Sequence, residues 1–232
     1  MSRVRKLCVS GLLSTVVLGL LTLGAPRAFA DSVTYYLTAI NAGVPLTGPF
    51  VSVTVELTSP TTANVTFTSL TNGGYVYLMG SQDAAGVNVN GAFTASAVNE
   101  TTSYSAAGFV PDFSGTIGSG NIDGFGTFNL IVENDNGFGA TATSISFTIT
   151  RTDGTWSSAA NVLTPNNEGA IAGSHVFPCP VPGCNSTLSA DLGERPLTRD
   201  VSTIPEPGTL IFMGTGLVML GGIVRRRKKS LS

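Results

Sequence analysis

The chain has 232 residues, of which only 11% are charged, against roughly 25% in an average soluble domain. Hydrophobic residues make up 42%, enough to form a core, so the composition excludes a chain that is disordered throughout. The length predicts one domain of ordinary size or at most two small ones.

The charges are unevenly distributed. Nine of the twelve cationic residues lie in 1–30 and 225–229. Residues 31–204 contain three arginines, no lysine and thirteen acidic residues, which gives this part a formal charge of −10. Affinity for nucleic acid comes from Lys and Arg that neutralise phosphates, so this composition excludes a nucleic-acid-binding surface there.

The N-terminus has the three parts of a secretory signal peptide. Cations at positions 3–6 precede an uncharged, mostly apolar run over 7–26, and the small residues Ala28 and Ala30 follow. We therefore predict a signal helix within 1–30 and cleavage between Ala30 and Asp31, with the Sec translocon and signal peptidase as partners. The alternative is an uncleaved membrane helix, but Pro26 ends the run just before the cleavage site.

The C-terminus predicts a membrane anchor. Pro205, Glu206 and Pro207 precede an uncharged run over 209–224, whose sixteen residues would form a helix of about 24 Å. Such a helix is somewhat short for a hydrocarbon core of about 30 Å, yet it can span if flanking cations snorkel. A basic cluster follows and is expected to stay cytoplasmic by the positive-inside rule. The cluster consists of Arg225, Arg226, Arg227, Lys228 and Lys229. A buried core helix is the alternative interpretation of the apolar run.

This ordered triplet of Pro-Glu-Pro, short apolar helix and terminal basic cluster resembles the PEP-CTERM sorting signal of diderm bacteria. The resemblance covers 205–229 and implies recognition at the inner membrane by an exosortase, a membrane enzyme thought to be a cysteine transpeptidase. It further implies that the tail is removed near Pro205–Pro207 and that the body is passed outward, often in species that make extracellular polysaccharide. On this reading the chain is a substrate of processing enzymes.

Residues 31–184 have the composition and periodicity of an antiparallel β-sandwich, which we expect to be jelly-roll-like. Residues 31–204 contain 25 Thr and 18 Ser, and strong helix formers are scarce. Apolar and polar residues alternate over 51–58, 65–69 and 144–150, which is the strand signal. The fold class is therefore all-β, with one ectodomain between the signal and anchor helices.

Turn signals divide this region. Asn72-Gly73-Gly74, Asn90-Gly91 and Asp123-Gly124 provide glycines for the positive φ of tight turns. We predict that 125–132 and 143–150 pair as antiparallel strands, and that the weakly patterned stretch 84–107 is a long loop or an edge. Prolines and thinning apolar residues make 185–204 a predicted spacer between the body and the membrane.

Cys179 and Cys184 are the cysteines that remain after signal cleavage, and they frame a Pro-Val-Pro-Gly sequence. In an oxidising, exported compartment such a pair predicts a small disulfide loop. A zinc site is disfavoured, because structural zinc needs four ligands and only His175 is nearby. We expect this sole histidine to lie at a strand end near the rim of the sandwich, and we assign no catalytic residue and no cofactor.

Three weaker site hypotheses remain open. Oxygen donors in turns are weak calcium candidates, with Asp123 and Asp135 the best placed in the sequence. The other donors are Asn121, Glu133 and Asn134.

Aromatic residues could stack on sugars, although core packing is the more common role of such residues. They are Tyr35, Tyr36, Tyr75, Tyr77 and Trp156, the last following a turn. Paired carboxylates for glycoside cleavage are compatible with the composition, but no two acids stand out.

The preferred functional hypothesis is an exported, non-enzymatic surface or matrix protein that an exosortase processes after transient anchoring in the inner membrane, with a link to exopolysaccharide or biofilm. The alternative is a carbohydrate-binding module that acts on extracellular polysaccharide, and a secreted hydrolase is a third, weaker possibility. The mature protein is expected at the cell surface or outside the cell.

Overall fold

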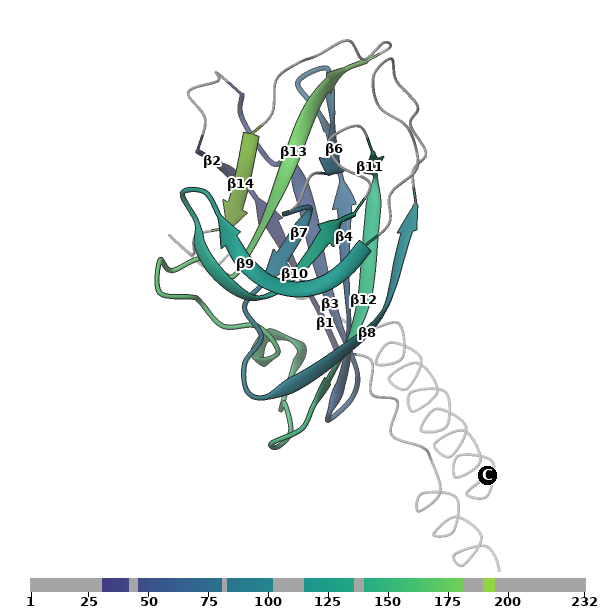
Figure 1. Cartoon of the computed structure of the whole chain (residues 1–232), viewed down its shortest axis with the longest axis vertical. Helices are drawn as coiled ribbons and strands as arrows, with labels where there is room; N and C mark the ends of the chain where they lie inside the picture. Colours follow the sequence, from purple (N-terminus) through teal and green to yellow (C-terminus); the bar gives the residue numbers. More distant parts are fainter. Residues whose placement is uncertain are drawn as a thin grey trace, which may run out of the picture.

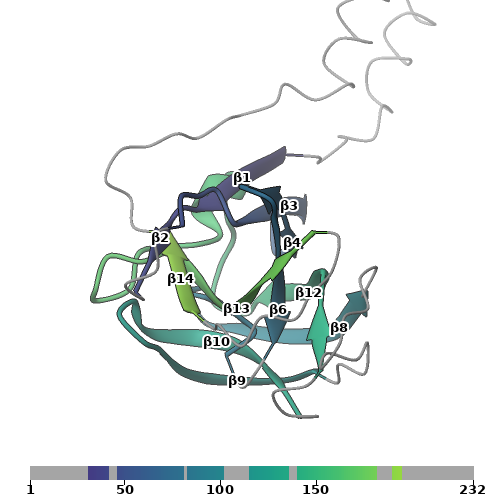
Figure 2. The same cartoon turned by 90° about the horizontal axis from the view of Figure 1, so that it is seen from above.

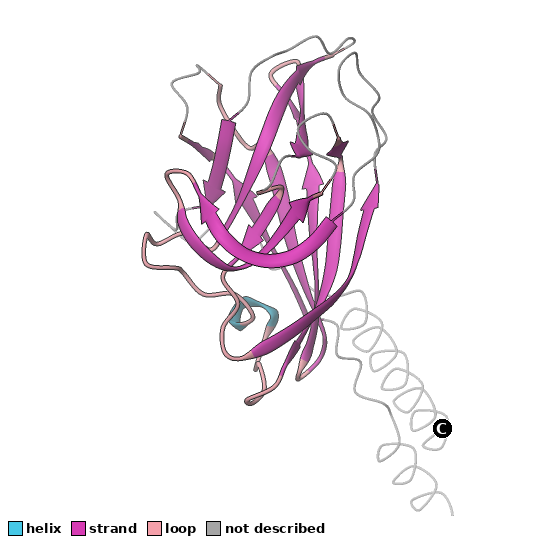
Figure 3. Cartoon of the chain, viewed as in Figure 1, coloured by secondary structure: helices cyan, strands magenta, loops and turns pink. Residues whose placement is uncertain are grey.

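The computed structural model describes residues 31–41, 46–80, 83–101, 115–135, 140–181 and 190–194. Within these residues the regular structure is almost entirely β-strand, with one 3-10 turn, η1 (Ala159–Asn161) (Figure 3). The all-β prediction is therefore confirmed. The expected signal helix within 1–30 and the expected membrane helix 209–224 lie outside the described residues and stay predictions.

A five-stranded antiparallel sheet, sheet A, forms one layer (Figure 1). In spatial order its strands are β1 (Asp31–Leu37), β3 (Val51–Ser59), β4 (Thr62–Ser69), β12 (Ser144–Arg151) and β8 (Phe93–Thr101). Along β3, Val51, Val53 and Val55 are fully buried, while the residues between them face the other side. The alternation predicted for 51–58, 65–69 and 144–150 is confirmed, because one face of this sheet covers the core and the other does not.

A second antiparallel sheet, sheet B, has nine strands. Its main path is β11 (Thr141–Ala142), β6 (Tyr75–Gly80), β13 (Ala172–Pro180), β7 (Ala85–Val87), β10 (Gly126–Asn134) and β9 (Gly115–Ile122). Three short strands extend it, namely β14 (Ala190–Glu194), β2 (Ala39–Ile40) and β5 (Thr71–Asn72). The β9–β10 hairpin curves around one side of the molecule in both views (Figures 1 and 2).

Strand β13 organises sheet B because both of its edges are paired. Val176 pairs with Met79 of β6 on one edge and with Ala190 of β14 on the other. Ala172 likewise pairs with Val87 of β7 and with Glu194 of β14. Strands β6 and β7 therefore follow one another along the same edge of β13.

The main core lies between the two sheets, and its buried residues come from both. Phe50 and Tyr77 meet edge to face with ring centroids 4.9 Å apart. At the same place Ser69 Oγ donates to the Tyr77 carbonyl at 2.6 Å and accepts from its N–H at 3.1 Å. These contacts tie the end of β4 in sheet A to β6 in sheet B. The sandwich prediction is confirmed to the level of two packed antiparallel sheets, and the jelly-roll likeness stays a prediction.

Three sequence-based predictions differ from the fold. The predicted pairing of 125–132 with 143–150 is wrong, because β10 pairs with β7 and β9 whereas β12 pairs with β4 and β8. The predicted spacer 185–204 contributes a strand, since β14 adds to β13, so the sheet extends beyond residue 184. For 84–107, the interpretation as a loop or an edge is wrong for β7, which lies inside sheet B between β13 and β10. It is confirmed for 93–101, because β8 is the edge strand of sheet A.

Candidate functional site: the outer face of sheet A

The side of sheet A that faces away from the core is covered with hydroxyl and amide groups. We call it the hydroxyl face, and it consists of the outward side chains that the strand register places there. These are Ser32, Thr34, Tyr36, Ser52, Thr54, Glu56, Thr62, Asn64, Thr66, Thr68, Thr94, Ser96, Asn99, Thr101, Ser144, Ser146, Thr148 and Thr150. All are Ser, Thr or Asn except Tyr36 and Glu56, so the face carries one ionisable carboxylate in a strongly acidic body.

The register arranges these groups in rows that cross the strands. Thr34, Thr54, Thr66, Ser146 and Asn99 form one row, each paired with the next on the neighbouring strand. Adjacent strands lie about 4.8 Å apart, so a row over five strands spans about 19 Å. Within this row Thr34 Oγ1 and Thr54 Oγ1 are hydrogen-bonded at 3.0 Å. Short side chains on a paired sheet lose little rotamer freedom when a ligand binds, so the array is preorganised.

A hollow of about 230 Å³ lies in the middle of the hydroxyl face. It is lined by Glu56, Asn64, Thr66, Asn99, Ser146, Phe147 and Thr148, which come from four neighbouring strands. Pockets for drug-sized ligands measure about 300–1,000 Å³, so this hollow is too small for a nucleotide cofactor and suits a compact polar group. Thr148 Oγ1 donates to Asn64 Oδ1 at 3.0 Å, which fixes the amide plane and presents Nδ2 as its donor end.

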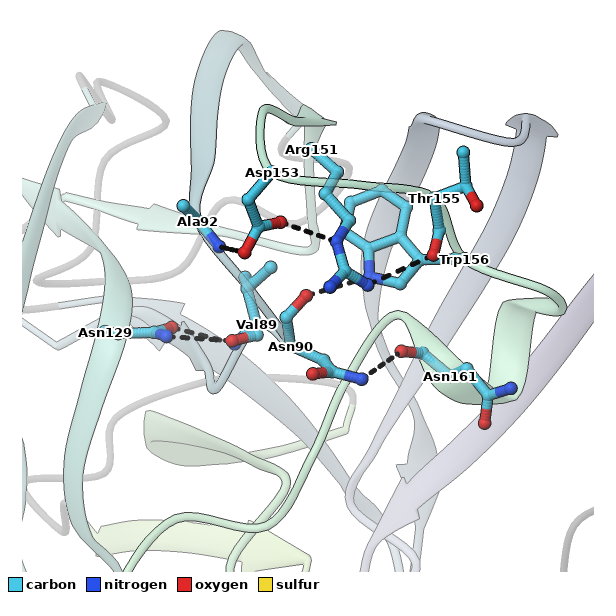
Figure 4. A network of polar contacts seen from close by, with 9 residues as sticks. All are labelled: Val89, Asn90, Ala92, Asn129, Arg151, Asp153, Thr155, Trp156 and Asn161. Carbon is cyan, nitrogen blue, oxygen red and sulfur yellow. Dashed lines mark hydrogen bonds and ion pairs between the residues drawn. The ribbon is translucent and has the colours of Figure 1, made fainter.

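A second polar cluster lies where the β12 end meets the turn before β8 (Figure 4). Arg151 Nε donates to Asp153 Oδ1 at 2.7 Å, and Arg151 Nη1 donates to the Thr155 carbonyl at 3.2 Å. The guanidinium also lies over the Trp156 ring, 5.8 Å from its centroid. The indole Nε1 in turn donates to the Asn90 carbonyl at 2.9 Å. The Arg151 contacts all lie within the segment 151–156, and the Trp156–Asn90 bond joins that segment to the turn before β8.

The pKa of the Asp153 carboxyl is lowered from its usual value by this arrangement. The larger cause is the backbone N–H of Ala92, which donates to Oδ2 at 3.0 Å, and the hydrogen bond from Arg151 adds to it. In the core, burial raises the pKa of the Tyr77 hydroxyl, which keeps it neutral. Neither group is placed to transfer a proton to a ligand on the hydroxyl face.

Most of the aromatic residues considered for sugar stacking are buried or half-buried, and Tyr36 is exposed. Trp156 is 3% exposed and Tyr77 is 1% exposed, so both belong to the core and the stacking hypothesis is wrong for them. Tyr35 is buried as well, and Tyr75 is half-buried and packs against the core. Tyr36 is 41% exposed and lies on the hydroxyl face. Tyr35 and Tyr36 are consecutive in β1, so their side chains point to opposite faces of the sheet. This period of two is the sequence signal that could have distinguished the exposed tyrosine from the buried one.

The weak calcium candidates are not brought together. Asp123 lies in the turn that precedes β10, whereas Asp135 follows the end of β10 and accepts a hydrogen bond from Thr116 Oγ1 at 3.0 Å. Asn134 is buried and its side chain donates to the Ala140 carbonyl at 2.9 Å. In the part of the chain that the structure describes, no group of three or more His, Cys, Asp or Glu is arranged to hold a metal ion.

His175 and Cys179 both lie on β13. His175 is in the middle of the strand, so the expected position at a strand end is wrong; its ring centroid is 5.3 Å from that of Phe177. Cys179 is fully buried and disulfide-bonded. Cys184, its predicted partner, lies outside the described residues, so the pairing of these two cysteines stays a prediction.

The residue that follows the predicted cleavage site is the first of the described residues. Asp31 is the first residue of β1, and its Oδ2 accepts a hydrogen bond of 2.6 Å from the Ala159 N–H at the start of η1. The remaining processing residues lie outside the described residues: Ala28, Ala30, Pro205, Glu206, Pro207 and the basic cluster 225–229. Among the residues that are described, no helix is long and apolar enough to cross a membrane.

Comparison with known proteins bears on the C-terminal segment. No curated protein and no solved structure shows significant similarity to the chain. Residues 203–228 match the family described as the PEP-CTERM protein-sorting motif. The match includes Pro205, Glu206 and Pro207, the apolar run 209–224 and most of the basic cluster. The chain therefore carries the sorting motif of an exported exosortase substrate.

Proposed function

We propose that this protein is a non-enzymatic component of the cell surface or of the extracellular polysaccharide matrix. A signal peptidase removes residues 1–30, the helix 209–224 holds the chain briefly in the inner membrane, and an exosortase cleaves near Pro205–Pro207. The observation that carries this proposal is the PEP-CTERM motif at 203–228. The acidic composition of 31–204 agrees with it, because a strongly negative body stays soluble outside the cell.

A non-catalytic role is favoured by the positions of the groups that hydrolases use. His175, the sole histidine, has its backbone N–H bonded to the Asp83 carbonyl and its ring against Phe177 within sheet B. The hydroxyl face contains one carboxylate, Glu56, whereas glycoside hydrolysis needs two that flank the scissile bond.

Mass spectrometry of the mature protein from its native host tests the processing. We expect an N-terminus at Asp31 and a C-terminus near Pro205–Pro207, with 209–229 absent. Glu206→Ala should leave the tail attached, whereas Glu168→Ala, a matched change in a loop of the body, should be processed like the wild type. Retention of 209–229 in all of the mature protein would refute exosortase processing. An uncleaved chain found soluble in the lysate would refute membrane anchoring as well.

The alternative function, carbohydrate binding, is favoured by one specific observation. The hydroxyl face presents hydroxyl, amide and carboxylate groups around a hollow of about 230 Å³. Sites for neutral polar ligands need such hydrogen-bonding groups, since they orient the ligand and give it specificity. A surface protein with this face would contact the polysaccharide directly and would not merely share its location.

A further inference from the structure

We propose that the hollow between Asn64, Asn99 and Thr148 is the binding site for one sugar unit of a neutral polysaccharide, whose chain runs across the strands toward Tyr36. This inference rests on the proposed carbohydrate-binding function and adds to it the site and the class of glycan. The groups that line the hollow include both donors and acceptors. A sugar hydroxyl is also both donor and acceptor, so it is complementary to such a lining.

The sheet orders the backbone of both asparagines, and a side-chain hydrogen bond also holds the Asn64 amide. Asn64 is paired with Thr148 across β4 and β12, and its Oδ1 accepts from the Thr148 hydroxyl at 3.0 Å. Asn99 is paired with Ser146 across β8 and β12, and Ser146 Oγ donates to the backbone carbonyl of Asn99 at 3.5 Å. Both amides therefore belong to adjacent rows of a hydrogen-bonded sheet, and a ligand binds to side chains whose backbone is already ordered.

Charge complementarity selects a neutral glycan. The hydroxyl face carries the single carboxylate of Glu56, and the body around it has a formal charge of −10 over 31–204. An anionic polysaccharide would be repelled by this field and would find no cation on the hydroxyl face. A neutral chain avoids the repulsion and can use the Glu56 carboxylate as an acceptor of strong hydrogen bonds.

Tyr36 gives the bound chain a direction. It is 41% exposed on β1, two strands from β4, and its row lies next to the row that contains Thr66. Two strand spacings place it about 10 Å from β4 across the sheet. An aromatic ring at this distance can cover the apolar face of a neighbouring sugar unit, so a polymer gains a contact that a monosaccharide does not reach.

Affinity electrophoresis of the full-length chain tests the proposal. Gels would contain dextran, mixed-linkage β-glucan or galactomannan as neutral probes, and alginate or hyaluronan as anionic ones. We expect at least one neutral polysaccharide to retard the wild-type protein and neither anionic one to do so. Asn64→Ala combined with Asn99→Ala should weaken binding at least tenfold, and Tyr36→Ala should weaken it severalfold.

Two further variants keep the result interpretable. Ser119→Ala combined with Thr127→Ala removes two exposed hydroxyls from sheet B and should bind like the wild type. Ser146→Gln fills the hollow without removing either amide and should also abolish binding, with the urea midpoint as a check on folding. If the Asn64→Ala/Asn99→Ala variant and the Ser146→Gln variant were both retarded as strongly as the wild type, the proposed site would be overturned but the carbohydrate-binding function would not. No retardation by any neutral probe, or retardation by anionic probes alone, would overturn both. If the wild-type protein were a dimer and Ser146→Gln made it a monomer, the hydroxyl face would be the contact surface for a second copy of the chain and not a sugar site.

Discussion

The two sheets differ most on the sides that face away from their shared core. On sheet A this side is the hydroxyl face, with the side chains of Thr68, Thr94 and Ser96 exposed. On sheet B the corresponding side carries two apolar clusters that are buried separately from the main core. One consists of Val76, Leu78, Phe177 and Cys179, and the other of Ile122, Phe125, Phe128, Ile131 and Ala170.

This difference explains why only one sheet could be recognised from periodicity. A strand with one solvated face alternates between polar and apolar residues, whereas a strand buried on both faces reads as a continuous apolar run. Thus β6, with the sequence Tyr-Val-Tyr-Leu-Met-Gly, has buried residues from Val76 to Gly80. Tyr77 and Met79 belong to the main core, while Val76 and Leu78 belong to the separate cluster. The outer face of sheet A is therefore available for binding, and that of sheet B serves stability.

The largest expected effect comes from truncating an outward residue of sheet B. Phe128→Ala should lower the free energy of unfolding by about 3–5 kcal/mol, because Phe128 is fully buried and its removal leaves a cavity. Thr68→Ala on the hydroxyl face is the matched control and should change it by less than about 0.5 kcal/mol. Urea denaturation of both variants measures the difference. Equal costs would show that the two outer faces are not distinct in the way described above.

A smaller effect is expected at the end of the sandwich shared by both sheets. Gly91 has φ of +98°, and a Cβ there would lie 2.8 Å from the Arg151 guanidinium. Gly91→Ala should therefore cost about 1–3 kcal/mol of stability in urea denaturation. Gly154→Ala, where the nearest atom would be Arg151 Nε at 3.5 Å, is the control and should be close to neutral. A neutral Gly91→Ala would mean that the Arg151 cluster adapts freely.

The carboxylate of Asp31 should contribute less to stability. Asp31→Ala removes the acceptor of the Ala159 N–H, so we expect a loss of about 1 kcal/mol. Ser32→Ala, one residue along on the hydroxyl face, should have little effect. The same denaturation measurement applies, made on protein with a verified N-terminus. If the two variants were equally stable, the link between β1 and η1 would be dispensable.

The smallest expected effect is the change in stability at low pH that depends on Asp153. The pKa of Asp153 is lowered in the folded protein, so its ionised form stabilises the fold above the unfolded pKa of about 3.9, and this contribution is lost as the pH falls through the folded value. The difference in urea midpoint between wild type and Asp153→Asn should therefore shrink as the pH falls from 6 toward 2.5. A difference that stayed constant over this range would contradict the assigned hydrogen bonds.

The candidate site shows the same division between local pattern and tertiary arrangement. The outward residues of β3, β4 and β12 could be predicted as polar from alternation alone. The hollow could not, because Asn99 reaches it only through a register shift of β8 opposite Ser146 and Thr148. Trp156 illustrates the opposite error: it follows a turn and was a plausible exposed platform, yet its indole is buried beside Asn90.

The sequence by itself determined the sorting motif at 203–228 and the strands β3, β4 and β12 of sheet A, because both depend on local order: prolines, an apolar run and cations in succession, or a period of two. Only the tertiary structure decided which strands are neighbours, that β14 joins sheet B, and that Asn64 and Asn99 line one hollow. Strand pairing joins residues far apart in the chain through backbone groups that every residue shares, so it leaves little trace in local composition.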